Sequence, residues 1–246
     1  MFHKKLFKSV RAGDAAVFTL SFLWICVIIQ TVILSPRGRE TAVLAPAAAE
    51  PTLILDAGHG GADGGAVAPD GTAESGLNLS VTRRVQDLCV FFGVDTLMTR
   101  ESEELSYPPE TQTIAAMKRW DTKRRVALAD GVENAVFLSI HQNIYPSASP
   151  RGAQVLYAQN EPSRALAEQM QAQLTAALLP ENRRVPVPAG KDIYILSHLR
   201  CPAVLVECGF LSHPQELALL KTEAYQKKIA SVLTACYLQF TEEPVL

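Results

Sequence analysis

Three short apolar runs, each ending in polar or ionisable residues, constrain the fold of this chain most strongly. They read "TLILDAG" from Thr52, "AVFLSIHQN" from Ala135 and "PAVLVECGF" from Pro202. Each run has the length of a buried strand, and longer segments with helical spacing of apolar residues separate the runs. Strands that alternate with helices predict an α/β fold with a sheet covered on both faces.

The remaining segments extend this alternation. Two further strands are predicted at "VDTLMTR" and "RGAQVLYA". Helices are predicted at "ESGLNLSVTRRVQDLCVFF", "IAAMKRWDTKRRVALAD", "EPSRALAEQMQAQLTAALL", "PQELALL" and "AYQKKIASVLTACYLQF". We therefore expect a single α/β domain over residues 51–246, built on a mixed, mostly parallel sheet flanked by helices.

The amino-terminal part of the chain has a different character. Residues 15–34, "AAVFTLSFLWICVIIQTVIL", carry no charge, and a helix of about 20 apolar residues spans the hydrocarbon core of a bilayer. Four basic residues precede this segment and two follow it, which favours a cytoplasmic location for residues 1–14. We therefore expect a transmembrane anchor or an uncleaved signal helix at residues 15–34, with the rest of the chain on the cell wall side of the membrane.

Residues 35–50, "SPRGRETAVLAPAAAE", are rich in proline and alanine and have no periodicity, so they are predicted to form a linker. Their "PAAAE" also offers a signal-peptidase site, and cleavage there would release a secreted protein. The site lies far beyond the apolar run, which favours the retained anchor.

The charge of the chain argues against a nucleic-acid partner. Its formal net charge is −2, and acidic residues outnumber basic ones from Pro51 onward. The short basic clusters "KRWDTKRR" and "NRR" are interpreted as solvated helix and loop surface rather than as a binding face.

The loop "DAGHGGADGG" after the first apolar run does not fit a nucleotide site. Asp63 stands where the dinucleotide pattern G-x-G-x-x-G needs its third glycine, and no Gly-Lys-Ser/Thr ending is present. An acidic residue at this point would also oppose the binding of phosphate.

A metal site fits the same residues better. His59 and His141 each follow or end a predicted strand, and the carboxyl ends of strands meet where such sheets bind ligands. A catalytic zinc takes three His or carboxylate ligands, and Glu74 could be the third. Glu207 inside "AVLVECGF" is costly to bury without a role, and could be the general acid/base. Considered singly, the histidines could serve only as hydrogen-bonding residues and Glu74 as a helix-start residue.

From about Thr52 to Phe240 the chain resembles the zinc-dependent N-acetylmuramoyl-L-alanine amidases with a type 3 catalytic domain. The resemblance rests on motifs in the family's order: "LILDAGHGGADGGA", the glutamate of "GTAESGLNLSV", "TLMTR", "RRVALA", "FLSIHQN", "RGAQVLY" and "PAVLVECGFLSHPQE".

This resemblance implies a function and a set of site residues. It implies Zn²⁺ as cofactor, with His59, Glu74 and His141 as ligands and Glu207 as the catalytic residue. The implied reaction is hydrolysis of the amide between N-acetylmuramic acid and L-alanine of the peptidoglycan stem peptide, so residues 51–246 would be a zinc amidase domain. The peptidoglycan substrate and the membrane helix agree on a site of action outside the cytoplasm.

Three further segments, "RGAQVLY", "RRVPVPAGKDIYIL" and "LLKTEAYQKKIASVL", are similar to the germination-specific type of this family. That similarity implies a part in forming muramic δ-lactam in spore cortex, with a polysaccharide deacetylase acting on the product or an activator protein as partner. Two alternatives remain open: a membrane-tethered zinc peptidase acting on stem peptides, and a non-catalytic wall-binding module.

Overall fold

A computed structural model describes residues 50–242 of the chain. The predicted cytoplasmic segment, the membrane or signal helix and all of the linker before Glu50 lie outside the described residues. Within residues 50–242, no helix has the length and apolar character that crossing a membrane requires.

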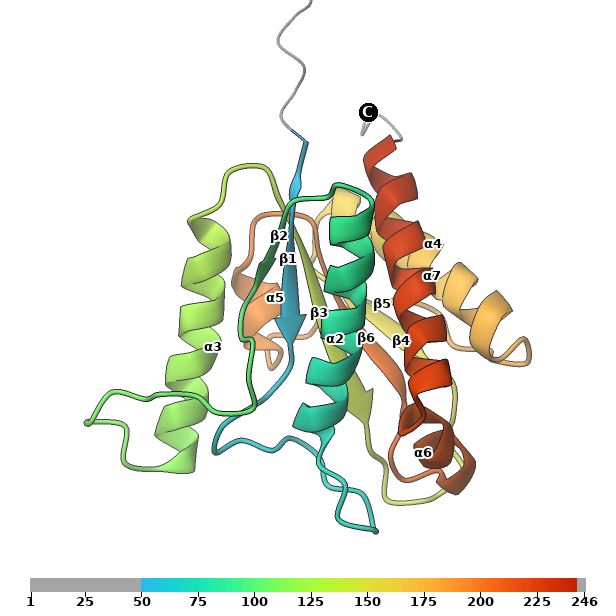
Figure 1. The fold of residues 1–246 in the computed structure, drawn as a ribbon, viewed down its shortest axis with the longest axis horizontal. Coiled ribbons are helices and arrows are strands. Elements are labelled where there is room, and N and C mark those ends of the chain that lie inside the picture. Colours follow the sequence, from blue (N-terminus) through green and yellow to red (C-terminus); the bar gives the residue numbers. More distant parts are fainter. Residues whose placement is uncertain (1–49, 243–246) are drawn as a thin grey trace, which may run out of the picture. The chain divides into compact units, whose positions relative to one another are not determined.

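The domain is built on one sheet whose strands run in the order β2-β1-β3-β6-β4-β5 (Figure 1). The strands are β1 (Thr52–Ala57), β2 (Thr96–Met98), β3 (Ala135–Asn143), β4 (Gln154–Tyr157), β5 (Val187–Pro188) and β6 (Ala203–Phe210). Strands β2, β1, β3 and β6 are parallel to one another, whereas β4 is antiparallel to β6. The prediction of a mixed, mostly parallel sheet is confirmed.

Helices cover both faces of this sheet. They are α2 (Glu74–Phe91), α3 (Ile114–Asp130), α4 (Glu161–Leu178), α5 (Tyr194–His198), α6 (Pro214–Leu220) and α7 (Glu223–Glu242). Helices α2, α4 and α7 pack their apolar residues against one face, and α3 and α5 pack against the other. The single α/β domain is therefore a three-layer structure.

The longer helices begin and end where their sequences predict. The Thr113 side chain accepts a hydrogen bond from the Ala116 amide and starts α3, which ends at Gly131. The Asn160 side chain accepts from the Ser163 amide and caps α4, with Pro162 in its first turn. These caps satisfy amides that lack a partner within the helix.

Two short elements lie outside the predicted pattern. Strand β5 has only two residues and one of them is proline, and α5 has only five. His198 is the last residue of α5 and is exposed. Segments this short contain too little periodicity to be distinguished from loops.

Alternation along the strands directs the polar residues to one side of the sheet. Ile54, Phe137 and Leu205 pack towards α3 and α5. Because side chains two residues apart share a face, Asp56, His141 and Glu207 lie on that same side, near the carboxyl ends of their strands.

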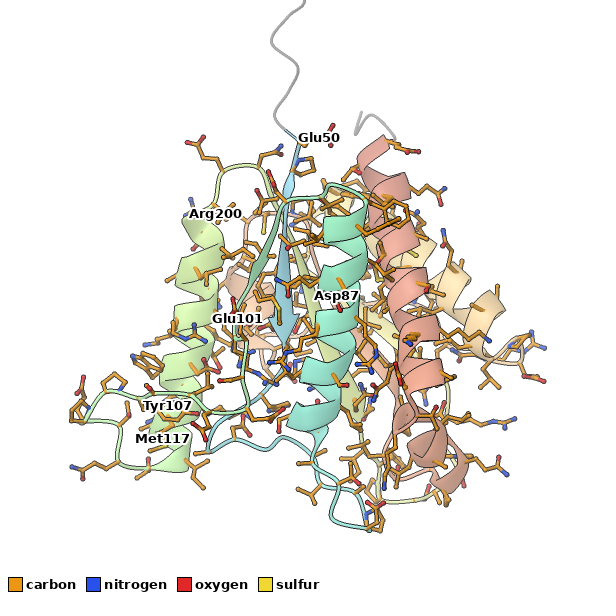
Figure 2. The ribbon with its side chains drawn as sticks, in the orientation of Figure 1. Glu50, Asp87, Glu101, Tyr107, Met117 and Arg200 are labelled. Atoms are coloured by element: carbon orange, nitrogen blue, oxygen red, sulfur yellow. The ribbon has the colours of Figure 1, made fainter. Side chains whose placement is uncertain are left out.

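The opposite end of β1 is closed by the last helix. The Tyr237 hydroxyl of α7 donates a hydrogen bond of 2.6 Å to the Pro51 carbonyl. Helix α7 also packs along α2 and α4. The chain therefore enters the domain, at Glu50, at the end of the sheet opposite to Asp56, His141 and Glu207 (Figure 2).

Candidate metal and catalytic site

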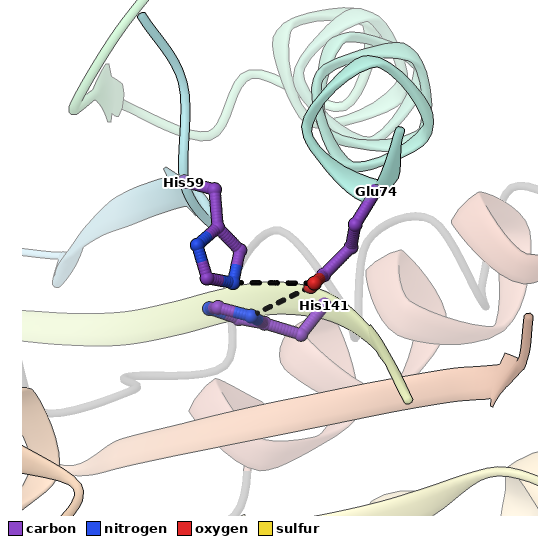
Figure 3. Close-up of side chains that lie close together, drawn as sticks. All are labelled: His59, Glu74 and His141. Carbon is purple, nitrogen blue, oxygen red and sulfur yellow. Dashed lines mark hydrogen bonds and ion pairs between the residues drawn. The ribbon is translucent and has the colours of Figure 1, made fainter. Parts of the chain in front are cut away.

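Three residues predicted as metal ligands converge at the carboxyl end of the sheet. His59 follows β1, Glu74 is the first residue of α2, and His141 lies near the end of β3. One nitrogen or oxygen from each lies within 4.8 Å of the others (Figure 3). Two imidazoles and one carboxylate form a donor set of the kind that binds a catalytic zinc.

The glycine loop makes this convergence possible. His59 itself has a φ of 61°, a left-handed backbone that turns its ring back towards the sheet. At Gly58, an added Cβ would lie 2.2 Å from Nε2 of His141, so a side chain there would displace the ring. At Gly65, with a φ of 68°, it would lie 2.5 Å from Oε2 of Glu74. The glycines therefore make room for the proposed ligands.

The Glu74 carboxylate is fixed by its surroundings. Its Oε1 accepts hydrogen bonds from the Asn78 side chain at 3.1 Å and the Gln142 amide at 3.0 Å, and its Oε2 accepts one from the Ala66 amide at 2.9 Å. Burial opposes its ionisation, but contacts with His141 and His59 outweigh burial and lower the pKa of Glu74. It is therefore held as a carboxylate.

Asp63 orients the His59 ring. Its Oδ2 lies 2.8 Å from His59 Nδ1, and on its other side Lys118 Nζ lies 3.1 Å away. This contact directs His59 Nε2 towards Glu74 Oε2, at 3.2 Å. Burial disfavours a charged ring, but Asp63 and Glu74 outweigh it and raise the pKa of His59 to about 9. The cluster thus stabilises positive charge at this point, which suits a cation.

Glu207 faces the same space from the adjacent strand. It lies opposite His141 in the β3–β6 register. Its Oε2 is buried and has no hydrogen-bond partner within residues 50–242. Burial raises the pKa of the Glu207 carboxyl to about 7, an effect that His141 opposes and Glu74 reinforces. A buried carboxyl with a free oxygen beside the three ligands has the position of a general acid/base.

An ion-pair network lies directly beneath the site. The Arg125 side chain is only 2% exposed and donates to Asp56 Oδ1 at 2.6 Å, to the Ala57 carbonyl at 2.7 Å and to the His59 carbonyl at 2.5 Å. It also pairs with Asp121 at 2.6 Å. The interpretation of "KRWDTKRR" as solvated surface is therefore wrong for Arg125. In a helix, some residues of any run of eight face the sheet rather than the solvent, and Arg125 is one of them.

A second buried arginine holds the same loop from the other side. Arg100, 4% exposed, follows β2 and donates to the carbonyls of Ala57, Gly58 and Ser75, at 2.9, 3.1 and 2.8 Å. Neither arginine was predicted as a functional residue. Each arginine stands at a position where the spacing of the apolar residues in its helix or strand predicts burial. A charged residue at such a position is the signal that could have identified them.

Three of the four predicted residues line one cleft of about 610 Å³. His59, His141 and Glu207 line its floor, while Glu74 lies beneath, behind His59. One wall is the amino-terminal half of α3 and the other is the segment Asp192–Ile195 at the start of α5. The cleft is therefore large enough for part of a polymeric substrate, with the reacting group over the floor.

Comparison with known proteins agrees with this architecture. Residues 53–236 match the N-acetylmuramoyl-L-alanine amidase family. A germination-specific N-acetylmuramoyl-L-alanine amidase of Bacillus subtilis (strain 168) is 36% identical over 195 residues, which cover 78% of this chain and 80% of that protein.

Solved structures show the same similarity. The CwlD amidase of Clostridioides difficile, solved in complex with the GerS lipoprotein, is 33% identical with a TM-score of 0.75, over 78% of this chain and 98% of that one. The Ami1 amidase of Mycobacterium smegmatis is 26% identical with a TM-score of 0.67, over 78% and 97%. This chain belongs to the N-acetylmuramoyl-L-alanine amidase family.

Proposed function

We propose that this domain is a zinc-dependent hydrolase that cleaves the amide between N-acetylmuramic acid and L-alanine of the peptidoglycan stem peptide. The observation that carries the proposal is the convergence of His59, Glu74 and His141 at one cleft, beside Glu207 Oε2, which has no hydrogen-bond partner in the part of the chain that the structure describes. Membership of an amidase family supports the choice of the bond.

The residues present fit a zinc ion. Two imidazoles and a carboxylate would hold it and leave a coordination position open. Asp63 and Asn78 stand behind the ligands as hydrogen-bond partners, an arrangement that fixes ligand orientation in metal sites. When bound, zinc supplies Lewis-acid chemistry, because it acidifies water and polarises a carbonyl oxygen.

Glu207 is the residue that we propose moves the proton. As a carboxylate, it takes a proton from the attacking water while the water oxygen bonds to the lactyl carbonyl carbon. When the carbon–nitrogen bond breaks, Glu207 gives that proton to the departing nitrogen of L-alanine. The products are a lactyl carboxylate and a peptide with a free amino terminus.

We also propose a location and partners. Residues 15–34 would anchor the chain in the membrane, with residues 1–14 in the cytoplasm and the catalytic domain on the cell wall side. The similarity to the germination-specific amidase supports a role in spore cortex, upstream of a polysaccharide deacetylase. The lipoprotein complex of the Clostridioides difficile relative supports an activator partner of that kind.

The proposal is tested on the full chain by zinc content and by the peptides released from purified peptidoglycan. Wild type should hold about one zinc per chain and release peptides that begin with L-alanine. His141→Ala should lose both properties, whereas Glu207→Gln should keep its zinc and lose activity by at least about a thousandfold, because only the proton-transfer group changes.

Three results would contradict the proposal in different ways. Released peptides that begin at another residue would favour the zinc peptidase. Wall binding without zinc or hydrolysis would favour the non-catalytic module. A Glu207→Gln chain with full activity would assign the proton transfer to another group.

A further inference from the structure

The cationic residues of α3 are divided between two roles by the helix. Arg124 and Arg125 both bond to Asp121, and Arg125 reaches on to Asp56 beneath the site. Lys118, Arg119 and Lys123 line the cleft, and so does Arg125, whose charge is already paired with Asp56 and Asp121. Arg125 thus belongs to the network that supports the fold, whereas among the described residues Lys118, Arg119 and Lys123 form no bond to that network.

Two of the cations in the cleft have no partner of their own. Lys118 is engaged by Asp63 at 3.1 Å. Within residues 50–242, Arg119 and Lys123 form no ion pair and no side-chain hydrogen bond, and both are exposed. Their positive charge is therefore available to a ligand in the cleft.

These cations lie close to the proposed reaction centre. Lys118 is linked to His59 through Asp63, by contacts of 3.1 and 2.8 Å. From Lys118 to Lys123 the helix rises by about 7.5 Å, which matches roughly two residues of an extended peptide. The opposite wall carries Asp192 as its one carboxylate within the described cleft, followed by the largely apolar run Ile193–Ile195. The wall formed by α3 also carries Asp121, but that carboxylate is paired with Arg124 and Arg125, so the charge left over on this wall is positive.

We infer that Arg119 and Lys123 form a carboxylate-binding subsite for the peptide part of the substrate, within about two residues of the scissile amide. The inference rests on the proposed function, since it concerns what lies beside the amide being cleaved. Arginine and lysine bind carboxylates through charge-assisted hydrogen bonds, which a carboxamide replaces only poorly. The enzyme would therefore select stem peptides that carry a free carboxylate near the cut.

The test uses two muropeptides that differ in one group. One carries a free α-carboxylate on the residue after L-alanine, and the other carries a carboxamide there. For the full wild-type chain we expect kcat/KM to favour the carboxylate by roughly tenfold, mainly through a lower KM, because the contact is made before and during the reaction alike. Added salt should reduce the preference.

The variant Arg119→Gln/Lys123→Gln should bring the ratio of the two kcat/KM values to about one. The matched control is Arg164→Gln/Lys227→Gln, which removes two exposed cations from α4 and α7 on the other side of the sheet and should keep the wild-type ratio. Equal kcat/KM values for the two muropeptides in wild type, or an unchanged ratio in the double variant, would overturn the subsite. If wild type releases no peptide beginning with L-alanine from either muropeptide, the proposed function itself fails.

Discussion

The proposed metal site depends on the absence of a side chain at Gly58. It is not in the left-handed region, so its backbone suits any residue, but a Cβ would lie 2.2 to 2.6 Å from three atoms of the His141 ring. We expect Gly58→Ala to move that ring and to weaken zinc binding by at least about tenfold, the size of effect seen when ligand orientation is lost. Titration with a zinc-competing chelator measures this change.

Gly64 in the same loop provides the control. A Cβ there would meet nothing closer than the Ala73 Cβ at 3.8 Å, an ordinary contact. Gly64→Ala should therefore bind zinc as wild type does. Equal zinc affinity in both variants would mean that the His141 ring can find another position that still binds the ion.

At the scale of elements, the network of Asp56 and Arg125 joins β1 to α3 beneath the site. Burial opposes ionisation of Asp56, but Arg125, Ser139 and Thr99 outweigh it and lower the pKa of Asp56 to about 2. Since the unfolded chain titrates near pH 4, this carboxylate contributes stability above that pH and loses it as the pH falls towards 2. The contribution is about 2 kcal/mol.

Urea unfolding between pH 5 and pH 2.5, in the presence of a chelator, tests the network. The free energy of unfolding should fall with pH in wild type, and the fall should be smaller by about 1 to 2 kcal/mol in Asp56→Asn, which cannot titrate at this position. Parallel curves for the two proteins would show that Asp56 is not the group whose protonation loosens β1 from α3.

At the scale of the whole molecule, the proposed ligands come from three elements that are far apart in the sequence. A bound ion would therefore link the loop after β1, the start of α2 and the end of β3. It would stabilise the folded state and not the unfolded state, in which these residues are far apart. At a zinc concentration about a thousandfold above Kd this stabilisation amounts to about 4 kcal/mol. Removing zinc from wild type should then lower Tm by roughly 10 °C, whereas the Tm of His141→Ala should not respond to a chelator.

Much of the architecture could be predicted from the sequence, because the long helices and buried strands have strong periodicity. Strand β5 and helix α5 could not be predicted in this way, since two and five residues carry almost no pattern. At the site, His59, His141 and Glu207 were indicated by strand ends, and Glu74 mainly by resemblance. Asp63 and Arg125 were missed as supporting residues, because their roles depend on which side of a loop or helix faces the sheet.

The hydrogen bond from Tyr237 to Pro51 has a consequence for the order of events during synthesis. The last helix packs along α2 and bonds to the residue just before β1, so α2 stays without this neighbour until residues near 240 have left the ribosome. Parallel pairing of distant segments is slow for the same reason. The amino-terminal half of the domain therefore cannot complete its native packing until the last helix has been made.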